Sequence, residues 1–452
     1  MADIRFRNRD ALARTDAHDV ALECLRAGIE AAHPAARVDE TIVVRDGTLT
    51  VTTVDGTTTE YDLDDYDDVL LVGGGNAAGH FATALEDELG DRLTDGAVVT
   101  DDPSETATVD LLAGDHPIPS ERGVEHASSV LEIAERADED DLVIATITGG
   151  GSALLAAPAE PLSLSDLQAV TEELLACGAT IDEINAVRKH CSAIKGGQLA
   201  RAAAPATVAT LVLSDVVGDD LSVIASGPTV PDPSTYGDAL GVLERYDLDV
   251  PAAVRDHLEA GARGNRPETP TADDPAFDRT SAHVLGSGRT ALEAAREAAA
   301  ERGYEPLVLA AGVRGEAREA ALTHVAIAEE CRETGEPASP PAVLLSGGET
   351  TVTLGDEPGC GGPNQEFVLN GALDLEADGI VVASVDTDGI DGATDAAGAI
   401  ADATTVPDAE GRAALERNDV LPVLDEADAL LRTGPTGTNV NDLRAIVVEP
   451  VE

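Results

Sequence analysis

Two glycine-rich stretches are the first places in this sequence where chemistry could occur. VLLVGGGNAAG, residues 69–79, contains the pattern G-x-G-x-x-[GA] at Gly73, Gly75 and Ala78. In dinucleotide-binding proteins such glycines let the backbone approach a pyrophosphate at the start of a helix. The pattern is short, so a kinase, a dehydrogenase or a tight strand-to-helix turn could each use it. Gly74 completes the triplet, and Asn76 follows it.

TGGGSALLA, residues 148–156, places a second glycine loop between an apolar run and an expected helical segment. Its bare amide groups are suited to an anion such as phosphate. The alternative is a glycine-rich turn needed only for close packing. The residues concerned are Gly149, Gly150, Gly151 and Ser152.

The segment INAVRKHCSAIKGGQLA, residues 184–200, concentrates cations. Of the 29 Lys and Arg residues in the chain, only Lys189 and Lys195 are lysines, and both fall here beside Arg188. An ammonium group can serve as a point charge for phosphate, and a guanidinium can pair with a carboxylate through two hydrogen bonds. The alternative for the lysines is an ion pair with one of the many acids. G-K-[ST] is absent, which excludes a P-loop enzyme.

Two acidic loops follow apolar runs and could hold a metal ion. SDVVGDD (214–220) contains Asp215 and Asp219, and DTDGIDGATD (386–395) contains Asp388. Magnesium usually binds one or two carboxylates together with substrate phosphates. The calcium-loop pattern is not met, because Ala397 stands where the bidentate acid belongs. Solvated surface acids are the alternative in a chain this acidic.

Five short apolar, β-branched runs must position these loops. Runs of this kind, followed by polar loops and usually by helical segments, predict parallel strands covered on both faces. Ligands of open α/β sheets bind beyond the carboxyl ends of the strands, where all five loops are expected. The runs span residues 69–72, 142–147, 208–213, 342–345 and 380–385.

The chain exceeds the size at which single cores usually stop growing, so two domains are expected. Residues 261–279, GARGNRPETPTADDPAFDR, break the periodicity and form the best linker candidate. Beyond them a strand, a glycine-rich turn and a helix begin again. We therefore predict one domain over residues 1–262 and another over 281–452.

The charge is extreme, with 86 acidic residues and a formal net charge of -57. Such self-repulsion is tolerated where salt screens it, which predicts a salt-rich cytoplasm. Nucleic acid is excluded as a partner because no basic stripe exists. No apolar run reaches membrane-spanning length, and the polar start lacks the apolar segment of a signal peptide. The sequence leaves open whether the protein is a monomer or a homodimer.

Nine segments, in order over most of the chain, resemble the glycerate 2-kinase family, the class II glycerate kinases with a C-terminal MOFRL domain, in a haloarchaeal-type member. The resemblance implies a larger Rossmann-like α/β domain, a smaller α/β domain and an active site in the cleft between them. It also implies that ATP, Mg²⁺ and D-glycerate give 2-phosphoglycerate and ADP. The segments are GGGNAAGHFATALEDELGDR, AGDHPIPSERG, TGGGSALL, GATIDEINAVRKHCSAIKGGQLA, LVLSDVVGDDLSVIASGPTVPDPST, LSGGETTV, GGPNQEF, DTDGIDGATDAAGAI and GPTGTNVND.

Our hypothesis distributes roles over these motifs. The two glycine loops cradle nucleotide phosphates, Lys195 and Lys189 neutralise the moving group, and Arg188 binds the substrate carboxylate. Asp215, Asp219 or Asp388 holds magnesium or accepts the proton of the substrate hydroxyl. Ser152 and Asn364 are expected at the substrate, Asn76 at the catalytic centre, and His116 either lines the cleft or is structural.

The sequence departs from the family pattern at two places. Asn76 stands where the family usually carries lysine, and Pro363 stands where it usually carries arginine. Asparagine can donate a hydrogen bond but carries no charge, and proline supplies neither a donor nor a charge. Nearby cations with magnesium then take over, or the substrate or activity has changed.

Two other functions compete with the kinase. An oxidoreductase acting on hydroxypyruvate would use the first glycine loop, but the acid it needs about 20 residues on is poorly placed, since Asp91 and Asp95 precede the next strand. A family member that binds a sugar acid or nucleotide without turnover is the third alternative.

Overall fold

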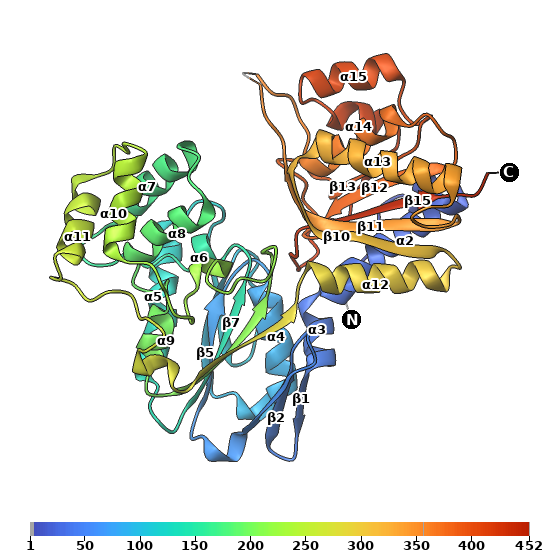
Figure 1. Ribbon diagram of the computed structural model, residues 1–452. Coiled ribbons are helices and arrows are strands. Elements are labelled where there is room, and N and C mark those ends of the chain that lie inside the picture. The colour runs from blue at the N-terminus through green and yellow to red at the C-terminus, as the bar shows by residue number, and fades with distance from the viewer. Residues whose placement is uncertain (1–3, 356, 452) are drawn as a thin grey trace. The chain divides into compact units, whose positions relative to one another are not determined.

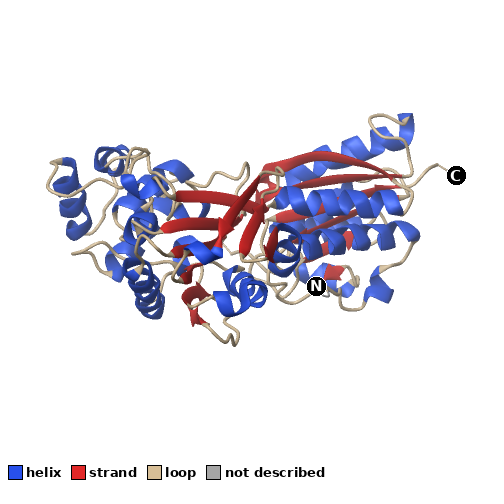
Figure 2. Cartoon of the chain, turned by 90° about the horizontal axis from the view of Figure 1, so that it is seen from below, coloured by secondary structure: helices blue, strands red, loops and turns tan. Residues whose placement is uncertain are grey.

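The structure is a computed structural model that describes residues 4–355 and 357–451. It divides into two compact units. The central unit is Arg37–Leu285, and the terminal unit joins the chain up to Ala36 to the chain from Gly286 onward. Figure 2 shows the strands of both units in red, with helices around them. The predicted α/β class is confirmed in both.

The central unit is built on a six-stranded sheet in the order β6-β5-β4-β7-β8-β9. Figure 1 labels β5 and β7 of this sheet. The pairs that join β6 to β8 across this sheet are parallel. A small antiparallel sheet lies beside it in the same unit, in the order β1-β2-β3. The strands are β1 (Ile42–Arg45), β2 (Thr48–Thr52), β3 (Thr58–Asp62), β4 (Val69–Gly74), β5 (Asp95–Thr100), β6 (Val109–Ala113), β7 (Leu142–Thr148), β8 (Thr207–Leu213) and β9 (Thr280–Gly286).

The apolar runs of β4 and β7 are continuous because both faces of the sheet are covered. Leu71 and Ile144 pack in one core with α4, whereas Val72 and Val143 pack in another with α5 and α9. A separate helical cluster is formed by α7, α8, α10 and α11. The helices are α3 (Pro34–Thr41), α4 (Ala78–Leu89), α5 (Glu121–Arg136), α6 (Gly151–Leu154), α7 (Leu164–Ala176), α8 (Ile181–His190), α9 (Gln198–Ala203), α10 (Tyr236–Arg245) and α11 (Ala252–Ala262).

The terminal unit has a mixed six-stranded sheet in the order β10-β11-β15-β12-β13-β14. Helices α2 and α12 cover one face, and α13 and α14 cover the other. The strands are β10 (Glu305–Glu316), β11 (Ala342–Thr351), β12 (Ile380–Asp386), β13 (Gly398–Ala401), β14 (Leu430–Leu431) and β15 (Asp442–Val448). The helices are α1 (Arg9–Leu12), α2 (Asp16–Ala32), α12 (Gly288–Glu301), α13 (Ala317–Thr334), α14 (Pro363–Asp374), α15 (Asp408–Glu416) and α16 (Leu421–Glu426).

The division differs from the predicted boundaries of 1–262 and 281–452. The segment 261–279 is a connection within the central unit, because it leads into β9, which lies beside β8 in the same sheet. The chain leaves this unit only after Leu285. At the other end of the sequence, α2 shares a core with α12 and β15, so the first residues belong to the terminal unit. Sequence order alone gives no sign of such a return.

Two local expectations also change. The polar loop expected after residue 345 lies inside β11, which runs on to Thr351 because β10 pairs with it as far as that residue. The helix expected after the second glycine loop is a single turn, α6, and the next helix begins at Leu164.

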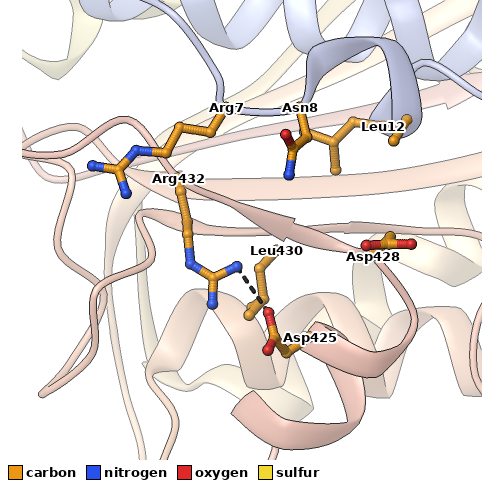
Figure 3. Close-up of a pocket in the computed structure, with 8 residues that line it drawn as sticks. Arg7, Asn8, Leu12, Asp425, Asp428, Leu430 and Arg432 are labelled. Carbon is orange, nitrogen blue, oxygen red and sulfur yellow. Dashed lines mark ion pairs between the residues drawn. The ribbon is translucent and has the colours of Figure 1, made fainter.

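A small cavity marks where the N-terminal segment joins the terminal unit (Figure 3). Its volume is about 80 Å³, far below that of a usual ligand pocket. Arg432 on its wall forms an ion pair with Asp425 at 2.9 Å and accepts the amide of Arg7 on its own carbonyl oxygen at 2.8 Å. None of the predicted site residues lines this cavity.

Candidate active site

The predicted site residues fall into two groups, one in each unit. In the central unit three loops meet at the carboxyl ends of β4, β7 and β8. The amide of Asn76 donates to the carbonyl oxygen of Gly149 at 2.8 Å. A Cβ atom on Gly150 would lie 1.7 Å from Asn76 Oδ1, and one on Gly149 would lie 2.2 Å from Asp215 Oδ2. The structure therefore brings both glycine loops and the loop after β8 together, as the sequence predicts for an open α/β sheet.

Close packing accounts for several of these glycines. Gly73 and Gly75 have φ of +146° and +145°. A Cβ atom on Gly73 would lie 2.0 Å from the carbonyl oxygen of Thr146, and one on Gly75 would lie 2.1 Å from Thr148 Oγ1. For the first loop, the geometry agrees with the alternative of a tight strand-to-helix turn. In the second loop the amides of Gly149 and Gly150 donate no hydrogen bond to any residue that the structure describes. Those two donors are available to an anionic oxygen.

Lys195 and Arg188 are neighbouring cations with no carboxylate partner among the described residues. Lys195 is 5% exposed, and its Nζ donates to the carbonyl oxygen of Leu155 at 2.6 Å. Burial, with a smaller contribution from Arg188, lowers the pKa of Lys195 to about 7. Burial also lowers the pKa of the half-buried Arg188. Two cations without an acidic partner among the described residues are unexpected in a chain with 86 acids, and they favour an anionic ligand at this place.

Lys189 forms an ion pair with an acid, which is the alternative that the sequence left open for the lysines. Its Nζ lies 3.3 Å from Asp232 Oδ1, and both side chains are buried. Asp232 also accepts from Thr269 Oγ1 at 2.9 Å and from Ser234 Oγ at 2.8 Å. This network anchors the C-terminal end of α8, so Lys189 holds the helix that carries Arg188.

Ser152 leads to two residues that sequence reasoning missed. Its hydroxyl lies 2.8 Å from the hydroxyl of Ser226, which donates to Asn185 Oδ1 at 3.0 Å. Both Asn185 and Ser226 lie inside quoted motifs, but no residue pattern distinguishes them there. The contact depends on a left-handed turn at Ala225 and Ser226, which a sequence does not display.

The second missed feature follows β5. Asp101 and Asp102 come directly after this strand, which is the neighbour of β4 in the sheet. An acid at this point is what a dinucleotide-binding fold uses for the ribose. The expectation that the acid is poorly placed rested on Asp91 and Asp95 alone and overlooked these two acids. Asp101 and His116 are exposed, and partial desolvation raises the pKa of Asp101 and lowers the pKa of His116, whose charge interacts with it.

Asn364 and Asp388 belong to the terminal unit. Asn364 is fully buried in the first turn of α14, and its Nδ2 donates to Asp442 Oδ1 at 2.7 Å and to Asp391 Oδ1 at 3.2 Å. Its Oδ1 accepts from Ser384 Oγ. Protein groups therefore occupy every polar atom of a side chain that we expected at the substrate.

Asp388 lies in the turn after β12, where its Oδ1 accepts the amide of Ile390 at 2.7 Å. Burial, then the charges of Asp388 and Asp442, raise the pKa of Asp386 well above its usual value. Among the described residues, no three His, Cys, Asp or Glu side chains are grouped so that they could hold a metal ion. A magnesium site here would need oxygen ligands from a substrate.

Asp391 makes the stability of the terminal unit depend on pH. Burial raises its pKa to about 7, against hydrogen bonds from the amides of Asn364 and Gln365. The folded state therefore binds a proton that the unfolded state releases near pH 4, and stability falls as pH rises from about 4 to about 7.

The expected loss is a few kcal/mol, because one pKa unit corresponds to about 1.4 kcal/mol. Thermal unfolding of the wild type and of Asp391→Asn at pH 5 and pH 8, in molar KCl, measures it. The Asp391→Asn variant should show a smaller difference between the two pH values. An equal difference in both proteins would assign the dependence to other groups.

The fold and these loops define a two-unit α/β protein in which two glycine loops and the loop after β8 meet beyond the parallel strands of its central unit. The sequence matches the domain of unknown function DUF4147 over residues 20–259 and the MOFRL family over residues 342–442. Among the described residues, no helix combines the length and hydrophobicity needed to cross a membrane.

Relatives of known name identify the family. A glycerate 2-kinase of Pyrococcus horikoshii is 42% identical over 84% of this chain and 87% of its own. A putative hydroxypyruvate reductase of Agrobacterium vitis is 44% identical with the same coverage. The crystal structure of a glycerate kinase from Thermotoga maritima matches with a TM-score of 0.81 and 36% identity, over 95% of this chain and 99% of that one. The chain therefore belongs to the DUF4147–MOFRL family that includes the glycerate 2-kinases.

Proposed function

We propose that the protein is a glycerate 2-kinase, which transfers the terminal phosphoryl group of ATP to D-glycerate. The observation that carries this proposal concerns Lys195 and Arg188, two cations to which no described residue supplies a carboxylate partner. They lie in the same unit as the amides of Gly149 and Gly150, which donate to no described residue. Phosphoryl transfer depends mainly on positioning and on cations around the moving group. The names of the relatives agree with a kinase that acts on an alcohol group.

The proposed roles follow the contacts. Lys195 stabilises the moving phosphoryl group, the second glycine loop holds phosphate oxygens, and Arg188 with Ser152 binds the carboxylate of the acceptor. Lys189 acts indirectly, through Asp232. Asp215 beside Gly149, together with Asp219, fits the one or two carboxylates that Mg²⁺ takes when phosphates complete its shell. Bound there, Mg²⁺ would neutralise charge on the phosphates.

The test is a coupled assay of ADP release in molar KCl, with ATP and Mg²⁺. Glycerate should be required for ADP release, and the product should be 2-phosphoglycerate by nuclear magnetic resonance. Related sugar acids are screened in parallel as acceptors. ADP release that does not depend on any sugar acid would contradict the proposal.

A hydroxypyruvate reductase is the second candidate, favoured by Asp101 and Asp102 at the end of β5 and by the name of the Agrobacterium vitis relative. Its activity would appear as oxidation of NADH or NADPH with hydroxypyruvate. Asp101→Asn should then raise the KM for the cofactor. If glycerate-dependent ADP release is present and cofactor oxidation is absent, this candidate is eliminated.

We further infer that the protein works in a salt-rich cytoplasm. At molar salt the Debye length is about 3 Å, so the repulsion within a chain of net charge -57 is screened. Far-ultraviolet circular dichroism should show loss of helix on dialysis from 3 M to about 0.05 M KCl, and recovery on return. A spectrum that stays unchanged at low salt would contradict this inference.

A further inference from the structure

Three chain segments that carry predicted site residues meet at one turn of the central unit, Ile224–Gly227. Ser226 Oγ contacts Ser152 in α6 and Asn185 in α8. The carbonyl oxygen of Ser226 accepts the amide of Gly196 at 3.0 Å, directly after Lys195. Ser226 therefore links the loop after β7, the helix of Arg188 and the segment of Lys195.

The turn is held in an unfavourable backbone conformation to make these contacts. Ala225 and Ser226 have φ of 49° and 62°, the left-handed region in which a Cβ atom is disfavoured. Glycine follows them at 227, also left-handed. Residues in such conformations persist only where surrounding contacts require them, and they cluster at functional sites.

The hydroxyls and the amide form a chain that leads from the core to the site. Ser226 is fully buried and Asn185 is 3% exposed, whereas Ser152 is half-buried. Asn185 Oδ1 accepts the proton of Ser226, while its Nδ2 is buried without any partner among the described residues. A buried amide nitrogen without an acceptor is costly.

Turning the Asn185 amide by half a rotation gives Nδ2 an acceptor in Ser226 Oγ and leaves Oδ1 as the atom without a partner among the described residues. An under-satisfied carbonyl oxygen is less rare in proteins than an orphaned N–H group. Nδ2 then donates to Ser226, Ser226 donates to Ser152, and the proton of Ser152 is directed to a ligand. Only this direction offers a donor to an anionic oxygen. Arg188 lies three residues after Asn185 on α8, so both are on one face of the helix.

We propose that Asn185 and Ser226 are positioning residues that direct the Ser152 hydroxyl as a donor to the carboxylate of the acceptor substrate. This proposal rests on the proposed function, because it names the group that the Ser152 hydroxyl would meet in the same site. A carboxylate is assigned because the neighbouring Arg188 can pair with it through two hydrogen bonds. Phosphate oxygens of the nucleotide share this chemistry, and separate KM values distinguish the two.

The experiment measures kcat and KM for glycerate and for ATP in molar KCl, with the full chain. Asn185→Asp keeps the shape of the side chain, but a carboxylate can only accept hydrogen bonds. Ser226 must then donate to residue 185 and Ser152 to Ser226, so the Ser152 proton no longer points to the substrate. The KM of this variant for glycerate should rise about tenfold or more, with KM for ATP within twofold of the wild type. Ser226→Gly removes the hydroxyl in a residue that suits the left-handed turn and should also raise KM for glycerate. Ala225→Gly relaxes the same turn without removing a hydroxyl and should leave KM unchanged.

A double variant separates the hydroxyl chain from a simple charge effect. If Asn185→Asp acts only by repelling the substrate, its effect adds to that of Ser226→Gly. If it acts through Ser226, it adds nothing once Ser226 is replaced. Additive effects, an unchanged KM for glycerate in both single variants, or a rise in KM for ATP alone would each overturn the proposal. Should Ser226→Gly not fold, Asn185→Asp and Asn185→Ala decide it.

The proposed function is tested before any variant is made. A wild-type protein without glycerate-dependent ADP release contradicts the kinase itself. A wild type that phosphorylates glycerate, with variants of unchanged KM, contradicts only the role of Asn185 and Ser226.

Discussion

Replacing Lys195 by methionine should lower kcat for phosphate transfer at least tenfold while the protein stays folded. Methionine matches the length of the buried stem, and the hydrogen bond to Leu155 is the one side-chain contact to a described residue that is lost. The ammonium group is expected to act on the transferring phosphoryl group, where the loss of one cation costs orders of magnitude in rate. Steady-state kinetics in molar KCl and circular dichroism of the same samples measure the two parts of this result.

The pH profile gives an independent readout. Because the pKa of Lys195 is about 7 in the free protein, its charged fraction falls as pH rises through that value. The wild-type kcat/KM should therefore decline above pH 7, since kcat/KM reports groups of the free enzyme. This decline should be absent in Lys195→Met. A decline that persists in the variant belongs to another group, and an unchanged kcat removes Lys195 from the site.

Much of the fold could be predicted, because each unit follows a strong local signal. The runs at 69–72, 142–147 and 208–213 became adjacent parallel strands, as continuous apolar segments covered on both faces must. The domain boundary was not predictable in the same way. A break in the helical pattern, such as the one at 261–279, is expected both for a linker between domains and for a connection within one domain. Only the place of β9 in the central sheet shows that the segment is a connection within one unit.

The candidate site was predicted unevenly, for a related reason. Glycine loops at strand ends can be located from sequence because strand direction fixes where they lie. The partner of a charged residue cannot, because it depends on which elements pack together. Lys189 and Lys195 are six residues apart and equally rare, yet one pairs with Asp232 and the other pairs with no acid that the structure describes.

The structure shows the surroundings of Asn76 and Pro363, the two residues that depart from the family pattern. Asn76 lies so close to Gly150 that no side chain fits at position 150, and no residue that the structure describes is a partner for its buried Oδ1. Pro363 occupies the first turn of α14, where its missing amide costs nothing. Neither residue supplies charge, which leaves Lys195 and Arg188 as the cations on which the proposed transfer depends.

Arg444 is the residue whose replacement should destabilise the terminal unit most. Its guanidinium is fully buried, lies 5.0 Å from the centre of the Phe367 ring and donates to Thr350 Oγ1 at 2.9 Å. Its carboxylate partner is Asp442, two residues earlier on β15. The register of the sheet places Asp386 opposite Asp442. Arg444 is therefore the cation among three buried or half-buried acids, and burial raises the pKa of two of them, Asp386 and Asp391.

Arg444→Leu leaves Asp442 buried without its counter-charge, which should cost about 3–5 kcal/mol of unfolding free energy. For a unit of this size the melting temperature should fall by about 6–20 °C. Asp442→Asn in the same chain should recover much of the loss, because the amide keeps an acceptor for Thr350 while removing the uncompensated charge. Calorimetry of the wild type, both single variants and the double variant in molar KCl measures the coupling. A double variant less stable than Arg444→Leu alone would show that Asp442 acts through its hydrogen bonds and that its charge needs no partner.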